Sequence, residues 1–132
     1  DGLGFGDNAK SALMTRGLAE CIRLGTALGA QSATFLGLSG VGDLMATGAS
    51  KLSRNYRVGF GLGRGQALPE ILATLGQVAE GVPTTRVVHQ LAQNSRIEMP
   101  VCAALYSILY QGRSAHEVVR ELLVRAARAE TG

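Results

Sequence analysis

Apolar residues recur at the spacing of an α-helix through most of this chain, and no alternating run is long enough to make a sheet. The longest such segment runs from Asp7 or Asn8 to about Leu28, and Gly29 follows it as a stop. Prolines stand where later helices would begin: Pro69, Pro83 and Pro100. The pattern predicts an all-α, multi-helical bundle of about seven helices joined by short loops.

One segment departs from this pattern. Val58, Phe60 and Leu62 alternate with glycines, as the residues of a short strand would. Glycines on both sides of these residues weaken a strand, because they lack a side chain to pack and gain conformational freedom when unfolded. We therefore expect a helix end or an irregular segment here.

The composition is that of a single globular domain. The chain has 132 residues, of which 46% are hydrophobic and 17% charged, so it is able to bury a core. A net charge of +3 is too small for the dense basic stripe of a dedicated nucleic-acid-binding protein. Cys21 and Cys102 lie in apolar helical patterns and are interpreted as buried thiols, and no zinc-ligand spacing is present. Without a signal peptide or membrane-spanning run, a cytoplasmic location is the default.

The stretch from Gly37 to Arg57, GLSGVGDLMATGASKLSRNYR, carries the strongest functional signal. Gly40 and Gly42 allow a close approach to the backbone, and Asp43 stands where a carboxylate caps a helix. The triplet Ser53, Arg54 and Asn55 combines a hydroxyl, a guanidinium and an amide, which suit phosphate oxygens and hydroxyl groups. The stretch predicts a site for a small anion, although a capped helix followed by a solvated loop fits the same residues.

Other polar residues are weaker candidates. Glu80 lies at a junction of glycine and proline between two helices, where a carboxylate could accept from ribose hydroxyls or serve as an ordinary linker residue. Lys10 suits a catalytic base, an anion ligand or a solvated first-turn lysine. The match of Gly4, Gly6 and Ala9 to a dinucleotide fingerprint lacks the strand that such a loop requires. His89 and His116 are interpreted as structural residues.

Three segments in order, DGLGFGDNAKSALMTRGLAE, GLSGVGDLMATGASKLSRNYRVGFGLGRG and GQVAEGVPTT, resemble signatures of bacterial NAD(P)-dependent glycerol-3-phosphate dehydrogenase. The resemblance covers essentially the whole chain. It implies that residues 1–132 form the helical, substrate-binding C-terminal domain, similar to the C-terminal domain of 6-phosphogluconate dehydrogenase. The N-terminal Rossmann domain of that family is absent from this chain, which does not begin with Met and is expected to be a fragment.

The resemblance also implies an activity and a set of site residues. The family transfers a hydride between NAD or NADP and dihydroxyacetone phosphate, giving sn-glycerol 3-phosphate for phospholipid synthesis, without a metal. Its catalytic lysine lies upstream of this chain, so Lys10 does not take that role, and Asp43 supports it. The substrate-binding positions are Asp43, Thr47, Ser53, Arg54 and Asn55. The cofactor-binding positions are Arg54, Val78 and Glu80.

Some questions stay open at this point. The preference for NAD or NADP depends on the missing Rossmann domain, which is the expected partner of this chain, and a homodimer is left open. No membrane span and no nucleic-acid partner are expected. Two alternatives remain: a module that binds a phosphate ligand without catalysis, and a weakly basic helical domain that binds nucleic acid. A steep salt dependence of DNA or RNA affinity would favour the second alternative.

Overall fold

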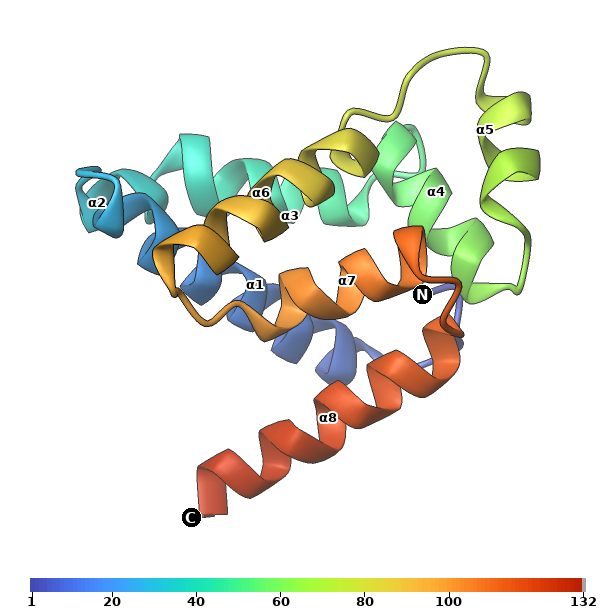
Figure 1. Cartoon of the computed structure of the whole chain (residues 1–132). Helices are drawn as coiled ribbons and strands as arrows, with labels where there is room; N and C mark the ends of the chain where they lie inside the picture. Colours follow the sequence, from blue (N-terminus) through green and yellow to red (C-terminus); the bar gives the residue numbers. More distant parts are fainter. Residues whose placement is uncertain (132) are drawn as a thin grey trace.

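The computed structural model describes residues 1–131, with side chains up to Arg125, and all regular structure in that range is helical (Figure 1). The elements are α1 (Asp7–Ala27), α2 (Ser32–Phe35), a π-helical turn η1 (Leu38–Gly42), α3 (Asp43–Ala49), α4 (Arg54–Gly63), α5 (Leu68–Leu75), α6 (Gly81–Ser95), α7 (Pro100–Tyr110) and α8 (Ala115–Thr131). The all-α prediction is confirmed. No helix within residues 1–131 is long and apolar enough to cross a membrane.

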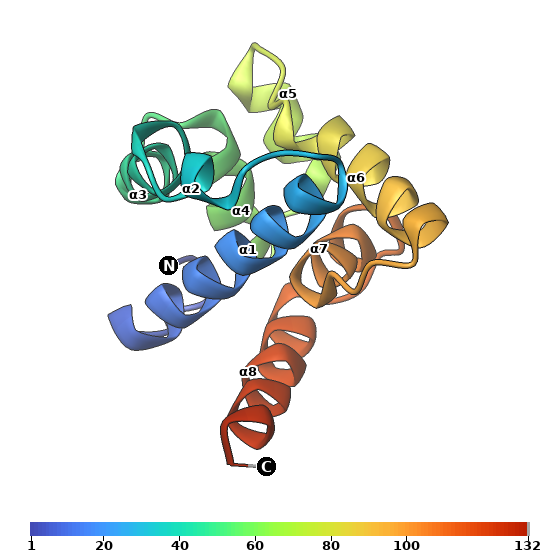
Figure 2. The ribbon, with the colours of Figure 1, turned by 90° about the vertical axis from the view of Figure 1, so that its left-hand side faces the viewer.

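Helix α7 occupies the centre of the bundle. It packs against α1, α6 and α8, as Figures 1 and 2 show, whereas α5 lies at one edge against α4. Six of the buried apolar side chains form two clusters. Leu24, Ala92 and Met99 join α1, α6 and the start of α7. Val58, Ile71 and Ala79 join α4, α5 and the segment before α6, with Leu109 of α7 packed on them. Helices α6 and α7 therefore connect the two parts of the core.

The observed starts and ends of the helices largely agree with those predicted from the sequence. Pro100 is the first residue of α7, and Pro69 lies in the first turn of α5, as predicted. Helix α6 begins at Gly81, two residues before the expected start at Pro83. Gly76 ends α5 in the left-handed conformation, with φ of 66°, which a residue without Cβ adopts easily.

The segment from Val58 onward is the second half of helix α4, which ends at Gly63, so the expected helix end is confirmed and the alternative of an irregular segment is wrong. Helix α4 spans Arg54–Gly63, and both Val58 and Leu62, one turn apart, contact the second core cluster. In the sequence, Phe60 between them makes the apolar residues appear to alternate as in a strand. Its side chain remains 42% exposed, so of these three only Val58 and Leu62 mark the buried face of the helix. Gly61 is buried against Ile71, so a glycine is needed where α4 and α5 come close.

The first helix caps the N-terminus of α7 from a distance in sequence. The carboxylate of Glu20, only 4% exposed, accepts hydrogen bonds from the backbone N–H of Val101 at 2.6 Å and of Cys102 at 3.0 Å. The residue at the N-cap position of α7 is Met99, which has no side-chain oxygen to do this. Arg23 of α1 adds a hydrogen bond to the carbonyl of Glu98.

The two cysteines lie beside this carboxylate. Cys21 is exposed, so the prediction of a buried thiol is wrong for it, whereas Cys102 is half-buried against the first core cluster. Desolvation, followed by the negative charge of Glu20, raises the pKa of both thiols above the ordinary value. Exposure alone therefore does not make Cys21 a reactive thiolate.

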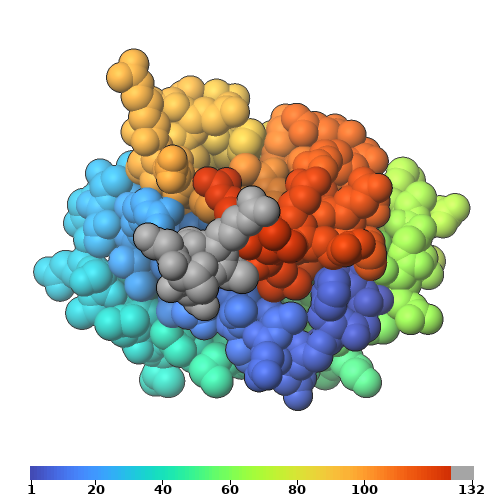
Figure 3. All heavy atoms as spheres, turned by 90° about the horizontal axis from the view of Figure 1, so that it is seen from below, coloured from blue at the N-terminus to red at the C-terminus, as the bar shows by residue number. Residues whose placement is uncertain are grey.

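The first residues of the chain lie at the molecular surface beside α8, as the space-filling view in Figure 3 shows. Residues Asp1, Gly2 and Leu3 and residues of α8 line the same apolar cavity of about 340 Å³. The N-terminal segment is thus part of the packed structure.

We expect Glu20→Gln to lower the free energy of unfolding by about 2 kcal/mol, because one buried N–H of α7 would then face an amide NH₂ group in place of a carboxylate oxygen. Urea unfolding of the 1–132 chain measures this change. The control is Glu70→Gln in the exposed first turn of α5, where we expect a loss below about 1 kcal/mol. Equal losses in the two variants would contradict the capping role of Glu20.

Candidate functional site

The N-terminus of α4 presents three of the predicted site residues together. Ser53 is the N-cap, and its Oγ accepts a hydrogen bond from the backbone N–H of Tyr56 at 3.3 Å. Because Oγ acts as an acceptor there, its hydroxyl proton is available to an incoming oxygen. Arg54 and Asn55 follow in the first turn, where backbone N–H groups have no partner within the helix.

These residues line a cavity of about 250 Å³, together with Leu52 and Glu80. The start of α4 and the start of α6 meet at this cavity. They are joined by a hydrogen bond of 3.0 Å, which Asn55 Oδ1 accepts from the N–H of Gly81. Glu80 occupies the N-cap position of α6. The structure therefore brings together Ser53, Arg54, Asn55 and Glu80, which the sequence placed in two separate segments.

Gln77 is a member of this arrangement that the sequence analysis missed. Its Oε1 accepts a hydrogen bond from Arg54 Nη1 at 2.9 Å, which restricts the otherwise exposed guanidinium. Gln77 lies between α5 and α6, and Val78 beside it is 60% exposed. The only signal in the sequence was its position in the GQVAEG segment, next to the predicted Val78 and Glu80.

Two predicted residues, Asp43 and Thr47, lie outside this cavity. They are one turn apart on α3, so they share a face of that helix, and their side chains make no hydrogen bond with the part of the chain that the structure describes. Asp43 is exposed and does not cap α3, contrary to prediction, because the π-helical turn η1 continues directly into α3. Its carboxylate is consequently available to a ligand or to another part of the protein.

The glycines before α3 serve the chain's own packing. A Cβ at Gly40 would overlap the carbonyl oxygen of Phe35, so the close approach predicted there is made by the end of α2. A Cβ at Gly42 would meet the Leu38 side chain and the carbonyl oxygen of Gly37 only at ordinary contact distance. Gly40 thus allows η1 to fold back on α2. A π-helical turn of this kind is frequent near functional sites.

The cavity at the start of α4 is suited to a small anion that also carries hydroxyl groups. The N-termini of α4 and α6 and the Arg54 guanidinium supply positive charge and N–H donors. Among the residues that the structure describes, Glu80 supplies the carboxylate that lines the cavity, and it can accept from hydroxyl groups. The volume is below the roughly 300–1,000 Å³ of pockets for drug-sized ligands, which suits a smaller molecule or part of a larger one.

Comparison with known proteins gives consistent matches. The family model described as NAD-dependent glycerol-3-phosphate dehydrogenase C-terminus matches residues 1–120. The chain is 54% identical over 130 residues to glycerol-3-phosphate dehydrogenase (NAD(P)+) of Thermoanaerobacter sp. (strain X514), which covers 98% of this chain and 39% of the relative. It is 53% identical over 129 residues to the enzyme of the same name from Lactiplantibacillus plantarum, covering 98% of this chain and 38% of the relative.

A solved structure shares the fold. The crystal structure of glycerol-3-phosphate dehydrogenase from Coxiella burnetii superposes with a TM-score of 0.91 and 43% sequence identity, covering 93% of this chain and 38% of that chain. The chain thus spans less than two-fifths of the length of the relatives named here.

We expect Gly81→Ala to displace the Asn55 amide, because the new Cβ would lie 2.8 Å from Asn55 Oδ1. The Asn55 side-chain signals in ¹H–¹⁵N NMR spectra should move, and the melting temperature should not rise. In the control, Gly59→Ala in α4, the Cβ meets no atom within 4 Å. That variant should gain stability by up to about 1 kcal/mol through helix propensity and leave the Asn55 signals in place. Identical behaviour of the two variants would contradict the contact between Gly81 and Asn55.

Proposed function

Because the chain belongs to the NAD-dependent glycerol-3-phosphate dehydrogenase C-terminus family, we propose that it is the substrate-binding domain of an enzyme that reduces dihydroxyacetone phosphate to sn-glycerol 3-phosphate. The observation that carries the proposal is the meeting of Ser53, Arg54 and Asn55 with the start of α6 around one cavity. Residues 1–132 form one helical domain, and the Rossmann domain lies upstream in the full-length protein.

The substrate phosphate binds at the start of α4. Arg54 donates two parallel N–H hydrogen bonds to the phosphate, a geometry that a lysine cannot reproduce. Ser53 donates its hydroxyl proton. Asn55 donates through Nδ2, since its Oδ1 is engaged by the N–H of Gly81. Gln77 keeps the guanidinium over the cavity. These three donors together orient the phosphate. The carbonyl end of the substrate then points away from the start of α4.

Asp43 and Thr47 act near the reacting end of the substrate. When bound, the reduced nicotinamide supplies a hydride to carbon 2 of dihydroxyacetone phosphate, and the carbonyl oxygen takes up a proton. The proton comes from the lysine expected upstream of this chain. Asp43, exposed at the start of α3 and without a hydrogen-bonding partner among the side chains described up to Arg125, orients that lysine or a substrate hydroxyl.

The residues around Gln77 fit one edge of a dinucleotide. Val78 offers an exposed apolar surface, Glu80 a carboxylate for ribose hydroxyls, and Arg54 a second set of donors for phosphate. NAD and NADP both satisfy this edge, because the residues that distinguish them lie in the Rossmann domain. We place the reaction in the cytoplasm, where its product supplies phospholipid synthesis, and a homodimer stays a prediction.

In the full-length enzyme, Arg54→Lys should lower kcat/KM for dihydroxyacetone phosphate about ten- to a hundredfold, with a higher KM and weaker cofactor binding. The melting temperature should hardly change, because Arg54 is exposed and contributes nothing to either core cluster. The matched control is Arg57→Lys, one turn further along α4, which lines a different cavity and should keep wild-type kinetics. Steady-state kinetics of both variants test this placement. If Arg57→Lys loses activity and Arg54→Lys does not, the phosphate site lies elsewhere.

The 1–132 chain alone should not reduce dihydroxyacetone phosphate, because it lacks both the Rossmann domain and the catalytic lysine. The full-length protein should reduce dihydroxyacetone phosphate with NADH or NADPH. The reaction is monitored by the fall in absorbance of the reduced nicotinamide. A rate above the blank for the isolated chain would overturn the division of labour proposed here. Inactivity of the full-length protein with both coenzymes would overturn the proposed function itself.

A further inference from the structure

We propose that Lys10 and Tyr56 are positioning residues, which hold the carboxylate of Asp1 and thereby align the segment upstream of Asp1 with the phosphate site on α4. The inference rests on the proposed function, in which that upstream segment carries the proton-donating lysine. The relatives named above are more than twice as long as this chain, and the matched family model describes a C-terminus, so this segment is part of the full-length protein.

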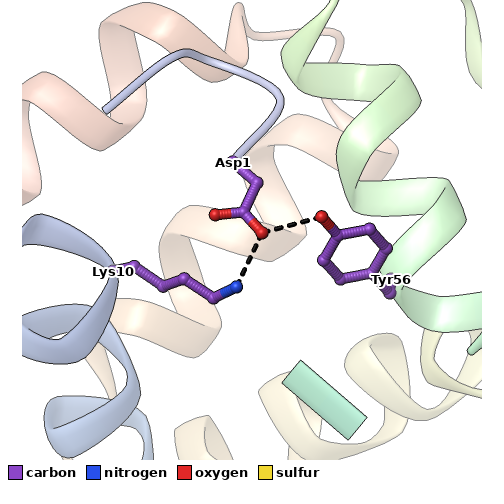
Figure 4. Close-up of polar contacts among 3 residues, drawn as sticks. All are labelled: Asp1, Lys10 and Tyr56. Atoms are coloured by element: carbon purple, nitrogen blue, oxygen red, sulfur yellow. Dashed lines mark hydrogen bonds and ion pairs between the residues drawn. The ribbon is translucent and has the colours of Figure 1, made fainter. Parts of the chain in front are cut away.

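The three side chains form one cluster (Figure 4). Asp1 Oδ2 accepts a hydrogen bond from Lys10 Nζ at 2.6 Å and another from the Tyr56 hydroxyl at 2.7 Å. The Lys10 ammonium also lies 5.6 Å from the centre of the Tyr56 ring, close enough for a cation–π interaction. Asp1 is therefore held at once by the first turn of α1 and the first turn of α4.

Tyr56 connects this cluster directly to the phosphate site. It follows Arg54 and Asn55 in the same turn of α4, and its backbone N–H bonds to Ser53 Oγ. One side of this turn thus faces the cavity, while the tyrosine hydroxyl reaches Asp1. Because a helical turn is stiff, the position of Asp1 is set relative to Ser53 and Arg54.

The backbone after Asp1 is held against α4 as well. Gly2 is buried, and a Cβ there would overlap the carbonyl oxygen of Phe60. A Cβ at Gly63 would lie 2.9 Å from the backbone of Gly2 and Leu3. The N–H of Gly4 closes a turn on the carbonyl of Asp1 at 2.9 Å. Residues upstream of Asp1 therefore depart from a point that is fixed on both its side-chain and its backbone sides.

The surroundings of Asp1 favour an ordered upstream segment. Asp1 borders the apolar cavity of about 340 Å³, whose walls include Leu13, Leu105 and Val119 of three different helices. Side chains that precede Asp1 in the full-length protein start at this cavity, so apolar ones among them have a surface to bury.

The cluster should affect catalysis more than stability. The side chains of Asp1 and Lys10 are 29% and 28% exposed, and partly exposed ion pairs contribute little to folding. Alignment is more sensitive, because a misplacement of about 1 Å at the reacting atoms costs up to about a hundredfold in rate. A lysine shifted relative to a substrate that is still bound by Arg54 lowers kcat and leaves KM unchanged.

The test uses the full-length enzyme with Tyr56→Phe, Asp1→Asn and Lys10→Met, and with Lys10→Arg as the conservative replacement. We expect the first three each to lower kcat about tenfold, with KM for dihydroxyacetone phosphate within about twofold of wild type. Lys10→Arg, which keeps the ion pair with Asp1, should recover most of kcat. The matched control is Tyr106→Phe in α7, which keeps the ring that stacks on His89 and should keep wild-type kcat.

The kcat values are compared per molecule that binds the coenzyme, with the melting temperature measured in parallel. A merely structural cluster would lower the melting temperature and the fraction of binding-competent enzyme but not kcat per competent molecule, and that result would overturn the inference. Wild-type kcat in Tyr56→Phe and Asp1→Asn would also overturn it. Both outcomes differ from failure of the proposed function, in which the wild-type enzyme itself would not reduce dihydroxyacetone phosphate.

Discussion

The bundle depends on a buried carboxylate that caps one helix from another. Glu20 of α1 accepts two backbone N–H groups at the start of α7, the helix that contacts α1, α6 and α8. Its nearly complete burial makes the interaction costly to break, because an unpaired buried N–H loses its hydration without compensation. The cap fixes the crossing of α1 and α7, and the first core cluster, with Leu24 and Met99 at that crossing, packs around it.

A series of specific contacts leads from this crossing to the candidate site. At the far end of α7, the Tyr110 hydroxyl donates to the carbonyl of Val82 in the first turn of α6. In the same turn, the N–H of Gly81 donates to Asn55. The helix that is capped by Glu20 thus holds the start of α6, and the start of α6 holds the start of α4. The site is supported by helix termini, which makes its donors more precisely placed than those of a free loop.

Glycine has two physical uses in this chain, and only one is visible without the fold. At Gly76 the backbone adopts a positive φ that ends a helix. At Gly40 and Gly61 the absence of Cβ instead lets another part of the chain come close, the end of α2 in one case and Ile71 in the other. The glycines before α3 therefore suggested a ligand where the chain itself is the neighbour. The glycines of α4 gave its apolar residues the apparent alternation of a strand.

The sequence by itself determined the all-α class, most helix starts and the grouping of Ser53, Arg54 and Asn55, because helical periodicity, prolines in first turns and adjacent polar residues are local properties. Only the tertiary structure decided that Glu80 joins that triplet, that Gln77 orients Arg54, and that Asp43 and Thr47 stand apart on α3. It also showed that Glu20 is a buried cap and Cys21 an exposed thiol. The reason is physical: whether a polar side chain is buried, and which donor it meets, depends on helices that are tens of residues apart in the chain and are brought together only when the core packs.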